Sequence, residues 1–123
     1  MKYLLLVTNQ TEEIGSWLAM SEEERGSLRA EEVPKWRELF AWVEQRGLEV
    51  DGLDLDPSGA RTVRVRDGET LVTDGPYAET KELIGGLFVV ECDDLDDAIE
   101  LASRVPVARK ASVEIRPLVG ASA

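Results

Sequence analysis

The sequence of 123 residues contains no histidine. This absence excludes Ser–His and Cys–His nucleophile pairs, histidine general bases and histidine metal ligands. Any chemistry must therefore come from carboxylates, lysine, tyrosine, hydroxyl groups or the thiol of Cys92. Because Cys92 is the only cysteine, the chain cannot form an internal disulfide. We expect a buried structural thiol and a reducing, cytoplasmic location.

Long apolar runs are also missing. The apolar run nearest the N-terminus covers residues 3–7, far fewer than the ~20 residues that cross a bilayer. It also lacks the length and cleavage pattern of a signal peptide. We interpret it as a strand of the mature protein and expect no membrane association.

Positive charge is scarce, with 14 basic against 25 acidic residues and a formal net charge of −11. Such a surface repels phosphate backbones, and Arg61, Arg64 and Arg66 are too few to form a strong basic patch. The composition therefore predicts no direct binding of nucleic acid.

Three nearby carboxylates resemble the beginning of a metal cluster, but they lack the glycine and the distal glutamate of a calcium loop. They are Asp51, Asp54 and Asp56. We expect neither a metal site nor a cofactor.

The hydrophobic periodicity predicts one α+β domain over residues 1–119, followed by a frayed tail at 120–123. The order of elements is that of a ferredoxin-like βαββαβ fold with an extra β-hairpin, an antiparallel sheet and both helices on one face. The expected elements begin with a strand at 2–8 and an irregular segment at 9–20 that could fold back as a flap. A helix then opens with a capping box at Ser21, restarts at Pro34 and ends at Gly47, and it is followed by a strand at 48–55 and a hairpin at 61–73 with a primed turn at Asp67-Gly68. The last elements are a strand at 87–90, a helix after Asp94 and a strand at 112–118.

The strands at 2–8 and 87–90 carry apolar side chains on both faces, and one layer of helices covers only one of them. Monomeric proteins rarely expose such a patch. We therefore predict a two-fold homodimer in which the uncovered sheet faces pack together.

The central stretch at 73–86 has the residues of a candidate site, beginning with Thr73-Asp74-Gly75-Pro76 and ending with Gly85-Gly86. Asp74 either caps a turn or moves a proton, and Tyr77 and Lys81 could contact an anionic or carbonyl-bearing ligand. Glu79 either pairs with Lys81 on a solvated helical turn or joins this site.

Other parts of the chain offer further ligand contacts. Arg64 and Arg66 are spaced to grip a carboxylate, unless they form a solvated hairpin face. Trp17 lies in the segment at 9–20 and could line the mouth of a pocket.

The run from Thr62 to Gly68, its continuation from Leu71 to Glu82, the glycine pair and Ser112 to Pro117 together resemble the DGPF-domain branch of the YCII-related proteins. The resemblance implies a dimeric α+β barrel of ferredoxin-like subunits. Some members resemble enzymes with a histidine–aspartate pair, which this histidine-free chain cannot form. Others lie beside, or are fused to, extracytoplasmic-function sigma factors.

Three functions follow from these patterns. The first is a homodimer that binds a small polar or aromatic metabolite in a cleft near residues 74–81, with or without acid–base chemistry. The second is a non-catalytic interaction module associated with a sigma factor and transcription regulation, and the third is a vestigial relative without activity. Whether the protein is an enzyme stays open at this point.

Overall fold

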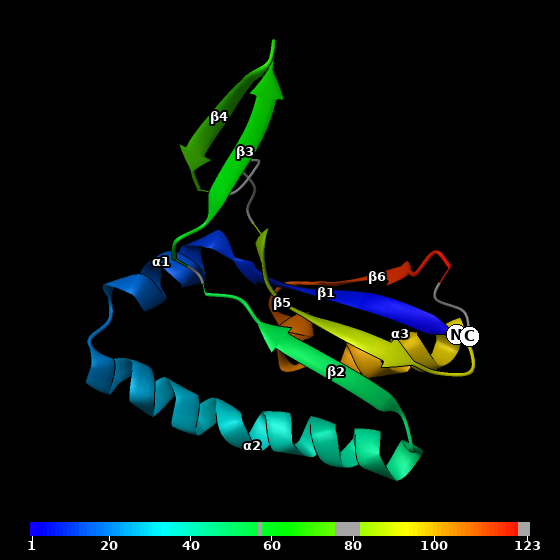
Figure 1. Ribbon diagram of the computed structural model, residues 1–123. Coiled ribbons are helices and arrows are strands. Elements are labelled where there is room, and N and C mark those ends of the chain that lie inside the picture. The colour runs from blue at the N-terminus through cyan, green and yellow to red at the C-terminus, as the bar shows by residue number, and fades with distance from the viewer. Residues whose placement is uncertain (57, 76–81, 121–123) are drawn as a thin grey trace.

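A computed structural model describes residues 1–56, 58–75 and 82–120 and has six strands, three α-helices and one 3-10 helix within them (Figure 1). In chain order these elements are β1 (Lys2–Gln10), α1 (Thr11–Ala19), α2 (Glu22–Arg46), β2 (Glu49–Asp54), β3 (Arg61–Arg66), β4 (Glu69–Asp74), β5 (Glu82–Glu91), α3 (Leu95–Arg104), η1 (Pro106–Arg109) and β6 (Val113–Pro117).

Four strands form the main sheet in the order β2-β5-β1-β6, and every neighbouring pair is antiparallel. α2 and α3 contribute to one core on a single face of this sheet. The predicted ferredoxin-like α+β arrangement is therefore confirmed. In the described part of the chain, no helix is long and apolar enough to span a membrane.

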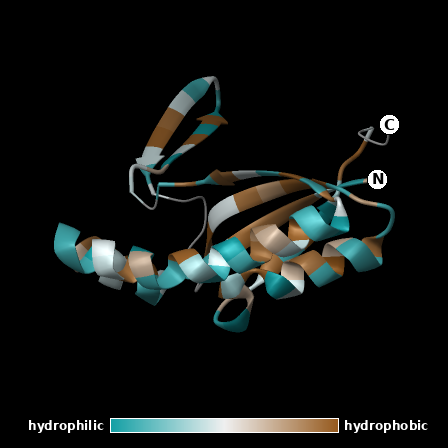
Figure 2. Cartoon of the chain, turned by 90° about the horizontal axis from the view of Figure 1, so that it is seen from below, coloured by the Kyte–Doolittle hydropathy of each residue, from teal (hydrophilic) through white to brown (hydrophobic). Residues whose placement is uncertain are grey.

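The core lies between the sheet and the two long helices, where Figure 2 shows apolar stretches of strand behind α2 and α3. Alternation along each strand sends every second side chain into this layer. The buried residues are Tyr3, Leu5, Val7, Leu39, Val43, Phe88, Val90, Cys92, Ala98, Leu101, Ala102 and Val105.

The uncovered face of the sheet carries the alternate apolar residues of the two central strands. Leu4 lies opposite Val89, and Leu6 lies opposite Leu87. Leu53 of β2 continues the second of these rows and is 64% exposed. Around them the same face is charged, with Lys2, Glu49, Asp51, Glu91, Glu114 and Arg116 at its edges.

The extra hairpin, β3 and β4, forms a separate two-stranded sheet. Its turn residues Asp67 and Gly68 have φ of 52° and 78°, the two positive values that a primed turn requires. The chain enters and leaves the hairpin at one point, because the amide of Gly75 donates to the carbonyl of Ala60 at 2.8 Å. Figure 1 shows the hairpin standing above the sheet, with α2 and α3 below it.

The prediction of an irregular segment at 9–20 is wrong, because Thr11–Ala19 forms α1. The local sequence has no side-chain cap and no apolar stripe strong enough to bury a residue. The contacts that hold it come from α2, where Arg25 donates to the carbonyl oxygens of Trp17 and Leu18, both at 2.9 Å. The last carbonyl groups of a helix have no partner within the helix, and Arg25 supplies partners for two of them. α1 is therefore stabilised by contacts with another helix, which the local sequence pattern does not show.

The expected restart at Pro34 is also wrong, because α2 runs unbroken for 25 residues with Pro34 inside it. The predicted ends are correct: Ser21 forms the capping box with Glu24, and Gly47 closes the helix at φ 67°. Pro34 removes only the hydrogen bond to the carbonyl of Ala30. Ala30 is exposed, so water can satisfy that carbonyl and the helix continues.

Candidate functional site

A small cleft of about 70 Å³ opens where the end of β1 meets the beginning of β5. β2, α2 and η1 close its other sides. Its lining residues are Val7, Asn9, Trp36, Leu53, Asp54, Gly85, Gly86, Leu87, Phe88 and Val107. Gly85, Gly86, Leu87 and Phe88 belong to β5, whose first residue Glu82 follows the segment at 76–81 in the sequence.

The glycine pair shapes the floor of the cleft. The register of β1 against β5 shifts between Val7 and Thr8, where Val7 faces Gly86 and Thr8 faces Ile84. Gly85 is therefore the extra residue of a β-bulge. A Cβ at Gly85 would collide with the side-chain amide of Asn9. Only a glycine at this position lets the Asn9 amide lie over the strand.

The second glycine of the pair has a separate packing reason. A Cβ at Gly86 would lie 3.0 Å from the carbonyl oxygen of Leu53 on the neighbouring strand. β5 and β2 therefore approach each other closely at Gly86.

An aromatic group forms one wall of the cleft. The ring centres of Trp36 and Phe88 lie 6.2 Å apart, and Phe40 packs against both at 6.3 Å. Phe88 is nearly buried and lies over Gly52, where an added Cβ would be 2.5 Å from its ring. Gly52 therefore fixes the position of the ring, and Trp36, which is half-buried, presents part of its indole to the cleft.

The polar groups of the cleft are the Asn9 amide and the Asp54 carboxylate. Outside the segments at 57, 76–81 and 121–123, no side-chain hydrogen bond of Asn9 is formed, so its donor and acceptor can both serve a ligand. No lysine or arginine is among the described lining residues. The local charge is therefore negative or neutral, which disfavours anionic ligands.

The predicted site residues that the structure describes do not gather in this cleft. Asp74 ends β4 with its side chain 90% exposed and forms an ion pair with Arg61 at 3.1 Å. Arg66 lies opposite Glu69 in the strand register at the turn end of the hairpin, and Arg64 lies opposite Leu71. Five residue steps along the strands separate Arg66 from Asp74, a distance on the order of 17 Å.

Trp17 lies on α1, where the guanidinium groups of Arg25 and Arg29 are 5.7 and 5.1 Å from its ring centre. It does not line the cleft. Tyr77, Glu79 and Lys81 fall outside the described residues. The ligand-binding and catalytic roles assigned to all these residues stay predictions.

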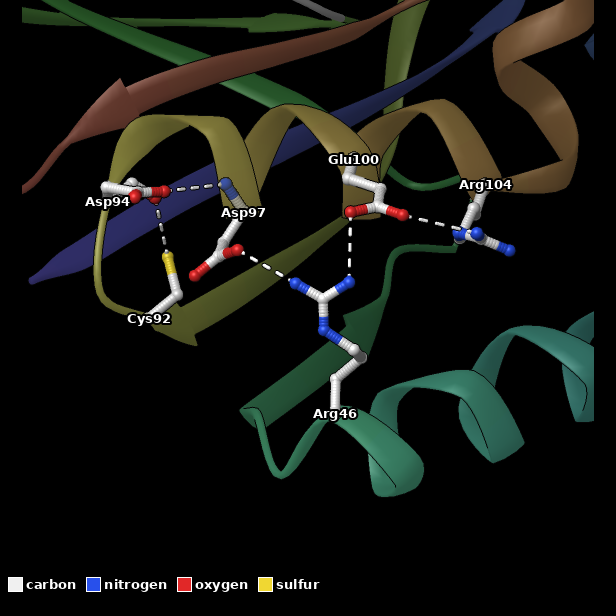
Figure 3. Close-up of polar contacts among 6 residues, drawn as sticks. All are labelled: Arg46, Cys92, Asp94, Asp97, Glu100 and Arg104. Carbon is white, nitrogen blue, oxygen red and sulfur yellow. Dashed lines mark hydrogen bonds and ion pairs between the residues drawn. The ribbon is translucent and has the colours of Figure 1, made fainter.

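A larger, polar hollow of about 460 Å³ lies at the opposite end of the sheet. There Arg46 at the end of α2 donates to Asp97 at 3.0 Å and to Glu100 at 3.1 Å, and Arg104 donates to Glu100 at 3.2 Å (Figure 3). These bonds tie α2 to α3. The hydrogen bond from Arg104, together with the charge of Arg46, lowers the pKa of Glu100.

Cys92 borders the same hollow and donates its thiol to the carbonyl oxygen of Asp94 at 3.3 Å (Figure 3). Burial, reinforced by the negative charge of Asp97, raises the pKa of this thiol. The thiolate needed for nucleophilic attack is therefore disfavoured. The prediction of a buried structural cysteine is confirmed.

The family model of the YCII-related domain matches residues 1–121. The chain belongs to the YCII-related family. The family predicted from the central motif is thus confirmed, and membership of the DGPF branch within it stays a prediction.

One relative of this YCII-related chain is "Uncharacterized protein R00369" from Rhizobium meliloti (strain 1021), which is 43% identical over 63 residues. The match covers 50% of this chain and 51% of that protein, so it spans about half the length of the curated relative.

Sequence reasoning did not assign Asn9, Trp36 or Asp54 to a site. Asp54 entered only as one of the three carboxylates considered for a metal, with Asp51 and Asp56. Asn9 lies at the end of an apolar strand, and the Gly85-Gly86 pair is typical of a bulge. Together these two features are the sequence signal that could have predicted a site at Asn9.

Proposed function

We propose that this YCII-related chain acts as a homodimer that binds a small single-ring aromatic compound in the cleft at Asn9 and Trp36. The observation that carries the binding proposal is the conjunction of an aromatic wall with a side-chain amide that has no partner among the described residues. Ligand sites commonly combine an apolar lining with a few such convergent polar groups.

Size and charge narrow the class of ligand. An apolar cavity of 150 Å³ can take up benzene, so an open cleft of about 70 Å³ accepts part of one ring and leaves the rest outside. The Asn9 amide matches a neutral hydroxyl, carbonyl or amide, and Asp54 repels a carboxylate. The ligand is therefore a neutral aromatic with a hydrogen-bonding edge.

The proposal is tested by thermal shift and calorimetry with the matched compounds benzamide, benzyl alcohol and benzoate. Benzamide and benzyl alcohol should bind, and benzoate should bind more weakly. Trp36→Leu and Asn9→Leu should remove the response. Trp42→Leu on the same helix should retain it, because Trp42 packs beneath Arg46 and Arg104, away from the cleft. Equal responses in all three variants would contradict the assignment.

The homodimer is supported by the uncovered face of the sheet, where Leu4, Leu6, Leu87 and Val89 form a continuous apolar centre. The total accessible surface also supports the proposed dimer. The chain exposes 8859 Å², whereas a compact monomer of 13.6 kDa exposes about 6,600 Å².

The difference of about 2,300 Å² remains positive after the contribution of the ten residues outside the described ranges is subtracted. An unfolded chain exposes about 160 Å² per residue, so these ten residues contribute at most about 1,600 Å². About 700 Å² of excess would still remain, close to the ~800 Å² that each partner buries in a standard interface.

Sedimentation equilibrium tests the dimer. Val89→Glu and Leu6→Glu should each give monomers at micromolar concentration, because each places two charges in the apolar centre of the interface. Ile99→Glu, which changes an exposed apolar residue on α3, should leave the dimer intact. A parent protein that sediments as a monomer would refute this part of the proposal.

The alternative of a sigma-factor interaction module rests on the resemblance in sequence alone and stays a prediction. Acid–base chemistry at Asp74 likewise stays a prediction.

A further inference from the structure

The β3–β4 hairpin exposes a face of valines that has no cover within the described chain. Val63 faces Val72 across the two strands and Val65 faces Thr70, so the three valines share one side of the hairpin. Val63 and Val65 are 60% exposed and Val72 is 59% exposed. A hairpin of two strands is at best marginally stable alone in water, so such a face calls for a partner.

We propose that this hairpin is a dimerisation arm, whose valine face packs on the second copy of the chain beside the sheet interface. The inference rests on the homodimer of the proposed function and extends it to a part of the chain that the sheet-to-sheet packing does not include.

The area of the interface favours this arrangement. The four strands of the main sheet have nine, six, ten and five residues, which at ~3.3 Å rise and ~4.8 Å spacing cover about 480 Å² per face. This figure is the flat outline of the sheet, so any further surface that packs beside it would enlarge the contact between the two copies.

The hairpin would enlarge this contact. Its two strands of six residues cover about 190 Å² per face by the same measure. Each copy would bury its sheet face, the valine face of its own arm and an equal surface beneath the arm of its partner. Together these outlines are about 860 Å², nearly twice the outline of the sheet alone.

Charge and position also favour a second copy as the occupant. The hairpin contains three arginines and three carboxylates, so the net charge of −11 resides in the rest of the chain. Two copies of this chain repel each other because both are negatively charged, and a neutral hairpin adds contact area without adding electrostatic repulsion. The arm stands on the side of the sheet opposite α2 and α3, which is the side of the proposed interface (Figure 1).

The test measures the dimer dissociation constant by sedimentation equilibrium for Val63→Glu and Val72→Glu. Because each substitution occurs twice in a dimer, we expect the constant to rise at least about a hundredfold. Leu71→Glu is the matched control, since Leu71 is also exposed but lies on the other side of the hairpin, and its constant should change only a few-fold.

A second variant removes the arm. The Gly75 amide and the Ala60 carbonyl are hydrogen bonded at 2.8 Å, so residues 61–74 can be deleted and the ends joined through a short glycine link. The shortened chain should keep its tryptophan fluorescence, since Trp17, Trp36 and Trp42 lie outside the hairpin, and should dimerise at least about a hundredfold more weakly.

The outcomes separate the two proposals. If Val89→Glu gives monomers while the valine variants and the shortened chain dimerise like the parent, the arm is refuted and the sheet interface stands. If Leu71→Glu weakens the dimer as much as the valine variants do, the valine face is not the contact. If the parent is monomeric, the proposed dimer and the arm both fail.

Discussion

Replacing Gly52 with alanine tests the packing on which both the core and the cleft depend. The new Cβ would lie 2.5 and 2.7 Å from two carbons of the Phe88 ring, closer than such atoms approach in real proteins. Gly52 has no positive φ, so the backbone itself accepts alanine and the effect is purely steric. Phe88 is held between the sheet and the rings of Trp36 and Phe40, so it has little room to move.

Overpacking of a well-filled core costs typically 1–3 kcal/mol, and we expect Gly52→Ala to lower the free energy of unfolding by about 2 kcal/mol. Gly26→Ala is the matched control. Gly26 lies in α2, and a Cβ there meets nothing within 4 Å. Because alanine favours a helix over glycine, this change should raise stability by roughly 0.5–1 kcal/mol.

Urea unfolding followed by tryptophan fluorescence measures both effects. The two variants and the parent must be compared at equal protein concentration, since the stability of the proposed dimer depends on it. Gly52→Ala should also weaken ligand binding in the cleft, because Phe88 would move against Trp36. A Gly52→Ala protein as stable as the parent would refute the steric argument, whatever the result for Gly26→Ala.

Three further predictions concern the helices and the thiol. Ser21→Ala should lower the free energy of unfolding by about 1 kcal/mol through loss of the capping box, measured in urea, whereas Ser27→Ala inside the same helix should not. Because the folded-state pKa of Glu100 is lowered, its ion pairs stabilise fully at neutral pH and lose this effect as the pH falls through the range where glutamates titrate. The stability lost in Arg104→Gln should therefore shrink toward about pH 3; a difference that stays constant with pH would count against this. Cys92 should react with a thiol reagent at least roughly a hundredfold more slowly in the native protein than in concentrated urea, and equal rates would show an open site.

The sequence predicted the elements that local signals specify. The capping box at Ser21, the left-handed Gly47 and the turn at Asp67-Gly68 are each encoded within a few residues, and each is confirmed. Hydrophobic alternation also predicted the strands and the layer of helices. Two predictions fail. α1 was missed because the hydrogen bonds that hold it come from Arg25 on another helix, and the restart at Pro34 was wrong because α2 continues through that residue.

The candidate site was less predictable for a related reason. Both Leu5 and Leu6 are apolar, and only the placement of the helices shows that Leu5 is fully buried in the core while Leu6 faces the opposite side. Asn9 contacts Gly85, 76 positions further along the chain, at a β-bulge. A single sequence does not reveal this contact. The motif at 73–86 identified the family, but its described part lies on the hairpin and along β5 rather than in one pocket.

The bulge at Gly85 has a wider consequence for how this chain can change over evolutionary time. β1 and β5 each have two apolar faces, with the odd positions of β1 in the core and its even positions on the uncovered face of the sheet. The loss or gain of one residue within such a strand would exchange the two sets of side chains. The extra residue at Gly85 confines such a shift to the strand end beside Asn9, so the alternation beyond it is kept.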